Sequence, residues 1–419
     1  MRKDITTGRD VAFDVAKGVG IVAVVGLHLS NRSASAFHDS GSPGWWVLKW
    51  TNLFLNFCVP LFLIVSAILL ARSASRQEKP DWKRFAWRRV RSILGPLVVW
   101  SVLYWLMRAF VQHDARVLTP GFWSDVKGRL MDVAFGKAEF HLYFMSILAQ
   151  VCLILPLFVV LFRRVRLDIW IVLLIAIILQ GASFALQKVV LFPYPGSTVF
   201  WYFSSVIPGI WIGMNWRDWP SIRRATWPAW ALLAAAGFAV FGYDSWLVLT
   251  KQQPNGTVMN AAASAYALGM PFLIIGLLTV WVGRMEEPSR PEARPTNLGA
   301  GRPLTLARTT RRPSPPGRRG VDGAFEDRLE ACATGSAEWL RRLGTMSLQI
   351  YLMHPVLMEV LTTSWRLPVM RRLPLPSVWL FLITLFGTYG IALLLSRTPY
   401  ADQILFGKEL PPKRQPAAE

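Results

Sequence analysis

Apolar stretches of about twenty residues recur along this chain of 419 residues, and they restrict the folds that it can adopt. As an α-helix, such a stretch crosses the ~30 Å hydrocarbon core of a bilayer and satisfies its own backbone polar groups. Ten stretches qualify: Val11–Ser30, Leu53–Ala71, Ser92–Phe110, His141–Phe162, Ile169–Leu186, Ser197–Met214, Trp227–Tyr243, Ala261–Gly283, Met346–Leu361 and Ser377–Leu395. The sequence therefore predicts an all-α polytopic membrane bundle of about ten transmembrane helices.

The first stretch, Val11–Ser30, has the length of a signal peptide. It carries Asp14 and Lys17, and no small-residue cleavage site follows it. We therefore expect it to be retained as a membrane span.

The positive charges of the chain concentrate in alternate loops. The net charge of +21 raises nucleic-acid binding as a function, but the basic residues lie between spans rather than in one basic domain, so no nucleic-acid partner is expected. Under the positive-inside rule, both termini of this multi-pass protein lie on the cytoplasmic side of a bacterial inner membrane. Seven residues depart from the rule: Arg116, Lys127, Arg129, Lys137, Arg366, Arg371 and Arg372.

Composition divides the chain into segments. The domains predicted are a membrane core with spans one to eight (1–284), an Arg/Pro-rich disordered cytoplasmic linker (285–335), an interfacial helix with spans nine and ten of the same core (336–400), and a cytoplasmic tail (401–419). The linker is expected to be attracted to anionic lipid heads, with regulation or partner docking as the alternative. Two amphipathic segments, Phe122–Phe135 and Glu326–Leu343, are predicted as surface helices.

Three cysteines, Cys58, Cys152 and Cys332, occur without a CxxC pair. A disulfide framework and a zinc site are both unexpected for this pattern. We therefore expect neither a metal nor a bound cofactor.

The first stretch carries ionisable residues that are costly to place in a bilayer. Lys17 lies one helical turn after Asp14, and its eleven-residue spacing to His28 brings the two within roughly 20° on the helix and about 16 Å apart. These side chains form one polar stripe on an otherwise apolar helix. A structural histidine with a local ion pair explains the stripe as well as a functional site does.

A basic cluster opens the third stretch. Arg88 and Arg91 share one helix face, and guanidinium groups bind phosphates in a forked geometry without losing their charge. They suit a diphosphate at the inner membrane surface. The alternative is an anchor that reaches the lipid head groups.

Two further stretches carry histidines. His141 opens the fourth stretch, near the outer surface. In the ninth, Ser347, Tyr351 and His354 are spaced as one polar stripe of a helix. Hydrogen bonding between helices is an equal explanation for this second stripe.

Taken in order, five motifs resemble those of the integral-membrane acyltransferase family 3, whose members O-acylate surface and secreted glycans. The motifs are Lys17-x10-His28; Val59-Pro60-Leu61-Phe62 with Ser66; Arg88-x-x-Arg91 with Pro96 and Trp100; His141-Leu142-Tyr143-Phe144; and Ser347-Leu348-Gln349-Ile350-Tyr351-Leu352-Met353-His354-Pro355. The chain departs from the family pattern at Lys17 (usually Arg), Ala67 (usually Gly) and Tyr143 (usually Trp). The resemblance runs from about residue 8 to 397 and skips the Arg/Pro-rich linker.

The resemblance implies transfer of an acyl group, with acetyl expected, from acyl-coenzyme A to a hydroxyl of a surface or secreted glycan. It assigns His28 and His354 to catalysis, and it assigns to substrate binding Asp14, Lys17, Arg88, Arg91, His141, Ser347 and Tyr351. The donor phosphates are expected at the cytoplasmic mouth, near the arginines. Lys17 keeps the charge of the usual Arg but loses its bidentate fork.

The expected partners are acyl-coenzyme A as donor substrate, a glycan or lipid-linked saccharide as acceptor, and membrane lipids. A sugar hydroxyl is a weak nucleophile, so a neutral imidazole at His28 is expected to take its proton, or to accept the acyl group first. The residues do not separate these two routes.

Two other classes of protein fit the same pattern. A transporter or flippase of a glycan or lipid-linked precursor also has many spans with buried polar stripes. A membrane scaffold would act through the Arg/Pro-rich linker. Transfer of label from acetyl-coenzyme A to glycan separates the enzyme from the transporter. The scaffold predicts that deletion of residues 290–320 removes function while His28→Ala does not.

Overall fold

The computed structural model describes residues 7–286, 335–362, 367–372 and 375–408, and this part of the chain is helical without strands. Eight of its helices are long and apolar enough to cross a membrane, and Val199–Met214 and Ser347–Leu361 are shorter apolar helices. The predicted all-α polytopic bundle is confirmed. The side of the bundle at which the first long helix, Thr7–Phe37, begins is here called the terminal side.

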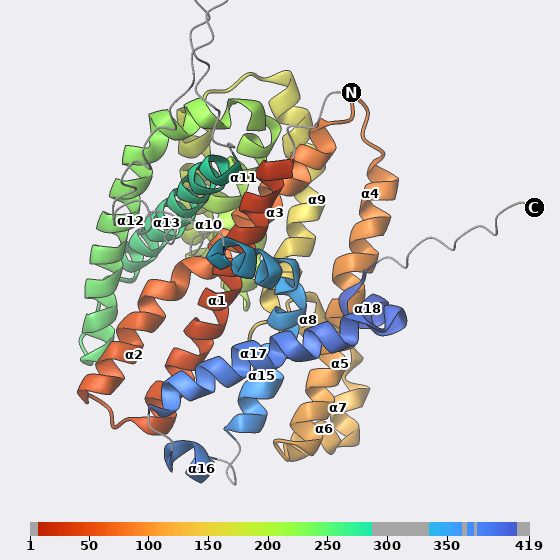
Figure 1. The fold of residues 1–419 in the computed structure, drawn as a ribbon, viewed down its shortest axis with the longest axis vertical. Coiled ribbons are helices and arrows are strands. Elements are labelled where there is room, and N and C mark those ends of the chain that lie inside the picture. The colour runs from red at the N-terminus through yellow and green to blue at the C-terminus, as the bar shows by residue number, and fades with distance from the viewer. Residues whose placement is uncertain (1–6, 287–334, 363–366, 373–374, 409–419) are drawn as a thin grey trace, which may run out of the picture.

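Figure 1 shows how the helices are arranged. The long ones are α1 (Thr7–Phe37), α2 (Pro43–Phe54) joined through a 3-10 turn (Leu55–Phe57) to α3 (Cys58–Ser75), α4 (Trp82–Arg89) joined through a π turn (Val90–Leu94) to α5 (Gly95–Phe110), α9 (Tyr143–Arg164), α10 (Ile169–Val190), α11 (Phe203–Met214), α12 (Trp219–Leu249), α13 (Gly256–Glu286), α15 (Ser347–Leu361) and α17 (Pro376–Ser396). Short helices are α6 (Ala115–Leu118), α7 (Pro120–Ser124), α8 (Val126–Ala134), α16 (Leu367–Arg372) and α18 (Pro399–Phe406).

Helix α1 occupies the middle of the bundle (Figure 1), where it contacts α2, α3, α13, α15 and α17. Its apolar side chains are buried, with Val15, Ile21 and Val25 fully inaccessible. A helix that packs on several sides is apolar around most of its circumference, and its few polar residues then point into the protein.

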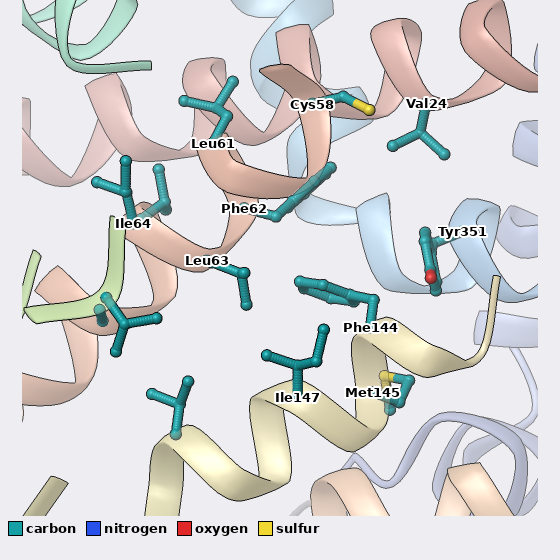
Figure 2. Close-up of a cluster of buried hydrophobic side chains, with 14 of the residues drawn as sticks. Val24, Cys58, Leu61, Phe62, Leu63, Ile64, Phe144, Met145, Ile147 and Tyr351 are labelled. Atoms are coloured by element: carbon teal, nitrogen blue, oxygen red, sulfur yellow. The ribbon is translucent and has the colours of Figure 1, made fainter. Parts of the chain in front are cut away.

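A second core layer joins α3, α9 and α15, as Figure 2 shows. Phe144 of α9 lies between Phe62 of α3 and Tyr351 of α15, with ring centroids 5.9 Å and 5.3 Å apart. These aromatic contacts attach α15 to the N-terminal part of the chain although the linker separates them in sequence.

Two helix pairs approach through glycine. A Cβ on Gly213 of α11 would lie 2.4 Å from the carbonyl oxygen of Ile68 on α3, and one on Gly269 of α13 would lie 2.5 Å from the amide nitrogen of Ala234 on α12. Small residues at such crossings let the helix backbones touch, which drives association where no hydrophobic effect operates.

Most basic residues that depart from the positive-inside rule are held by local partners. Arg116 and Arg129 pair with Asp114 and Asp132 at 2.9 Å and 2.6 Å, and Lys137 lies 5.0 Å from the Tyr194 ring centroid. Arg371 donates to the Ala36 carbonyl at the end of α1, 2.7 Å away. Lys127 and Arg372 are exposed, and Arg366 lies outside the described residues.

Three predicted segments outside the spans differ from the structure. The Phe122–Phe135 segment is two helices, because the Asp125 carboxylate caps a new helix by accepting from the Gly128 amide at 3.0 Å. The described part of the predicted surface helix, 335–345, packs on α1, and its Leu343 is fully buried. Residues 401–406, expected in the tail, belong to α18, whose Phe406 is buried.

Candidate active site

His354 owes its orientation to the residue that follows it. Pro355 has no N–H, so the carbonyl of Tyr351, four residues earlier, lacks its usual helical donor. The Nδ1 atom of His354 lies 2.8 Å from that carbonyl oxygen and donates to it. The ring is therefore the Nδ1–H tautomer, which leaves a lone pair on Nε2. Nε2 is buried and has no hydrogen-bond partner among the described residues.

His28 lies directly beside this ring, although it comes from α1. The His28 and His354 rings are stacked with centroids 5.3 Å apart and planes at 22°. Phe140 covers His28 from another side at 4.7 Å. His354 is completely buried, whereas His28 keeps part of its surface accessible.

His141 completes a group of three histidines. It lies in the turn before α9, with its ring 5.6 Å from that of His354 and 5.0 Å from that of Tyr104. It is 1% exposed, and neither ring nitrogen has a hydrogen-bond partner within the part of the chain described. The three residues His28, His141 and His354 are called the histidine cluster below.

Two tyrosines fix the backbone around the histidine cluster. The Tyr351 hydroxyl donates to the His141 carbonyl oxygen. The Tyr104 hydroxyl of α5 donates to the Leu352 carbonyl oxygen at 2.7 Å. These bonds tie α5, α9 and α15 together where the imidazoles meet, and pre-organised side chains are what catalysis requires.

Two ion pairs lie near the cluster, toward the side of the bundle at which α1 ends. Arg32 of α1 bonds to Glu359 of α15 at 3.2 Å, and Arg108 of α5 lies 3.5 Å from Glu139. Burial raises the pKa of the Glu139 carboxyl, and the Arg108 guanidinium opposes part of that rise. The sequence analysis missed both pairs, because each joins segments that are far apart in the chain.

Asp14 and Lys17 form the predicted ion pair, at 2.6 Å. The pair is separated from the histidine cluster by about 16 Å of helix. It lies beside the 335–345 helix, where a Cβ on Gly344 would overlap the Asp14 carbonyl oxygen. The structure thus places Asp14 and Lys17 at the terminal side, away from His28.

Arg88 and Arg91 also lie at the terminal side, and both are exposed. Neither forms an ion pair within the described ranges, and Arg91 stacks on the Trp87 ring at 5.6 Å. They flank the start of the π turn, a feature that often marks functional positions in helices. Gly407, just after α18, packs on this turn: a Cβ on it would lie 2.6 Å from the Arg91 carbonyl oxygen.

The polar stripe of α15 runs inward toward the cluster. Ser347 begins the helix and is 8% exposed, Tyr351 follows one turn later, and His354 comes next. Of the residues predicted for the site, the structure brings together His28, His141, Tyr351 and His354. Tyr104 and Phe140 join them and were missed, because apolar spans contain many aromatic residues.

The histidine cluster does not have the arrangement of a metal site. Across the described ranges, no group of three histidine, cysteine, aspartate or glutamate side chains is arranged to hold a metal ion. The three imidazoles are instead packed among aromatic rings.

The comparisons with known proteins concern mainly the N-terminal part of this site. The sequence model of the acyltransferase domain, acyltransferase family 3, matches residues 10–291, more than half of the chain. The chain belongs to acyltransferase family 3. The match contains His28, Arg88, Arg91 and His141, whereas the α15 motif with His354 lies beyond it.

A relative and the solved structures add to this result. The nodulation protein NolL of Mesorhizobium japonicum is 24% identical over 275 residues, which cover 64% of this chain and 68% of NolL. No solved structure matches the chain. Membership of family 3 and the membrane-length helices make this protein a multi-pass membrane acyltransferase.

Proposed function

We propose that this acyltransferase moves an acyl group, with acetyl expected, from acyl-coenzyme A to a hydroxyl of a surface or secreted glycan, and that His28 is its reactive base. One observation carries the assignment of His28. Of the three clustered imidazoles, His141 and His354 are at most 1% exposed, while His28 is partly accessible. We therefore expect a substrate to contact His28 rather than either of the two buried rings.

The proposed step conserves atoms and charge. The acceptor hydroxyl oxygen forms a bond to the thioester carbonyl carbon as His28 takes the hydroxyl proton, and the carbon–sulfur bond then breaks. The imidazolium returns its proton to the thiolate, so the products are an ester and free coenzyme A. Acylation of His28 before transfer uses the same nitrogen and remains an alternative order of events.

We propose that His354 holds the His28 ring in position through their stacked contact. Its Nδ1 donates to the Tyr351 carbonyl oxygen, and its ring is stacked with that of His28 at a centroid distance of 5.3 Å. His354→Asn keeps a donor near the Nδ1 position but removes the stacked ring. We expect this variant to lower kcat while the KM values for donor and acceptor stay unchanged, because positioning acts on the transition state. A rise in KM without loss of kcat would instead give His354 a substrate-binding role.

The donor would bind at the terminal side. The π turn and α5 extend about 20 Å from Arg91 to Tyr104, whose ring contacts that of His141. Along α1, Lys17 lies about 16 Å from His28. Phosphates held by Arg88 and Arg91 would therefore lie about the length of one long, flexible chain from the His28 imidazole. Coenzyme A carries such an arm between its phosphates and its thioester.

Arg91→Lys is expected to raise the KM for acyl-coenzyme A more than the KM for the acceptor. Lysine keeps the charge but cannot make the forked contact to phosphate. Initial rates measured with each substrate varied in turn test this expectation, with Arg84→Lys in the adjoining α4 as the matched exposed control. An unchanged KM for the donor would remove Arg91 from the phosphate site.

The whole proposal is tested by supplying radiolabelled acetyl-coenzyme A to membranes that contain the protein. We expect label in the glycan fraction, and none with the His28→Ala variant. Translocation of glycan without transfer of label would favour the transporter or flippase interpretation.

A further inference from the structure

The helix that follows the last span, α18, lies against the start of the third span, far away in the sequence. It packs beside α5 (Figure 1), where the indole of Trp100 donates to the Leu405 carbonyl oxygen at 2.8 Å. The ring of Phe406, which is 1% exposed, lies 6.2 Å from that of Trp100. A buried aromatic contact and an indole hydrogen bond therefore hold the end of α18 in place.

Gly407 brings the end of α18 into direct contact with the π turn. It ends the helix in the left-handed conformation, with a φ angle of 67°, and its amide donates to the Gln403 carbonyl oxygen at 2.9 Å. A Cβ on Gly407 would lie 2.6 Å from the Arg91 carbonyl oxygen and 2.7 Å from the Ser92 Cα. Glycine is therefore required here both by the backbone conformation and by the space.

The π turn (Val90–Leu94) determines how the arginines at the start of the span are oriented relative to α5. A π turn contains one residue more than an α-helical path, so it rotates the helix before it by about 100° relative to a continuous α-helix. Such turns are rare, and packing by neighbouring segments maintains them. Here both α9 and Gly407 contact the turn.

We propose that α18 is part of the donor site and that Gly407 is a positioning residue, which maintains the π turn so that Arg88 and Arg91 face the donor phosphates. If the turn relaxed to an α-helix, Arg88 would rotate by about 100° relative to α5, and its contact with phosphate would be lost. The inference rests on the phosphate binding proposed above for these two arginines. It adds to the donor site a segment beyond the family match, which ends at residue 291.

The effect on the π turn is measured without substrate, as amide hydrogen exchange followed by mass spectrometry on the full-length protein in detergent. In Gly407→Ala the added Cβ must displace the end of α18, so peptides that contain residues 90–97 should exchange faster than in the wild type. Gly41→Ala is the matched control. Gly41 has a φ angle of 85°, but no atom of the described residues lies within 4 Å of the added Cβ. This variant has the backbone strain without the contact, and its exchange at residues 90–97 should equal that of the wild type.

Donor binding is measured as the Kd for radiolabelled acetyl-coenzyme A in the absence of acceptor. We expect Gly407→Ala to raise this Kd about ten-fold, equivalent to about 1.4 kcal/mol, and Gly41→Ala to leave it unchanged. The kcat at saturating donor should stay unchanged, because Arg91 lies about 20 Å along the helix from Tyr104. A purely structural role for Gly407 would instead lower the number of binding sites without changing the Kd, and would overturn the proposal.

Trp100→Phe tests the same contact if Gly407→Ala does not fold. Phenylalanine keeps an aromatic ring beside Phe406 but cannot donate to the Leu405 carbonyl oxygen. We expect faster exchange at residues 90–97 and a smaller rise in Kd than for Gly407→Ala. Unchanged exchange and an unchanged Kd would overturn the proposal.

Arg91→Lys distinguishes failure of this inference from failure of the proposed function. If Arg91→Lys raises the Kd for acetyl-coenzyme A but Gly407→Ala does not, α18 is not part of the donor site and the proposed function stands. If the wild-type protein binds no acetyl-coenzyme A although Gly407→Ala speeds exchange at the turn, α18 supports the π turn, but the proposed donor is wrong and this inference fails with it.

Discussion

His28→Ala is expected to lower kcat for acyl transfer by about 10²- to 10⁴-fold, the usual contribution of a positioned general base. The fold should survive, because His28 is partly accessible and no hydrogen bond of its side chain holds a neighbouring helix in the described structure. If His28 acts as the nucleophile, the loss is at least as large. The measurement is the rate of label transfer with purified protein at saturating donor.

The control for this experiment is His113→Ala. His113 is exposed, lies in the loop after α5 and has no place in the histidine cluster. Its variant should transfer at the wild-type rate. Wild-type transfer by His28→Ala would remove His28 from the mechanism, and an equal loss in the two variants would show that the effect is not specific to the site.

Gly213→Ala is expected to lower the stability of the helical bundle. The new Cβ would lie 2.4 Å from the Ile68 carbonyl oxygen and 2.9 Å from the Ala71 Cβ, so α11 and α3 would have to separate. Overpacking of this kind costs about 1–3 kcal/mol. The expected result is a lower Tm in detergent, read as the temperature at which the buried thiols of Cys58 and Cys152 become reactive.

Gly283→Ala is the control, and it is not expected to lower the Tm. Gly283 lies near the end of α13, is exposed, and has no atom within 4 Å of the added Cβ. Alanine favours the helix over glycine by up to about 1 kcal/mol, so Tm should stay the same or rise. A Tm for Gly213→Ala equal to that of Gly283→Ala would show that α11 and α3 are not in close contact.

The spans were predictable because a membrane span is a local property of the sequence. Twenty apolar residues can be recognised without knowledge of their neighbours, and the helices lie where the hydropathy placed them. The predicted ends of the spans were less accurate. The second span begins at Pro43 rather than Leu53, because Ser42 caps a helix that the sequence analysis did not extend through the aromatic run after it.

In the candidate site, too, only features that depend on local sequence were predictable. The Asp14–Lys17 pair lies one helical turn apart, so helix geometry alone predicted it, and the structure contains it. The π turn at Val90–Leu94 was not predictable, because its packing against α9 and the residues after α18 involves distant segments. The Arg32–Glu359 and Arg108–Glu139 pairs were not predicted either, because each joins segments that are far apart in the chain.

By itself, the sequence determined that this chain is a helical membrane protein with imidazole and guanidinium groups on particular helix faces, since periodicity and hydrophobic length are local. Only the tertiary structure decided which of these groups meet. His28, His141 and His354 lie on three separate segments, and their contact depends on how α1, α9 and α15 pack. Packing depends on shape complementarity between distant surfaces, which no single stretch of sequence contains.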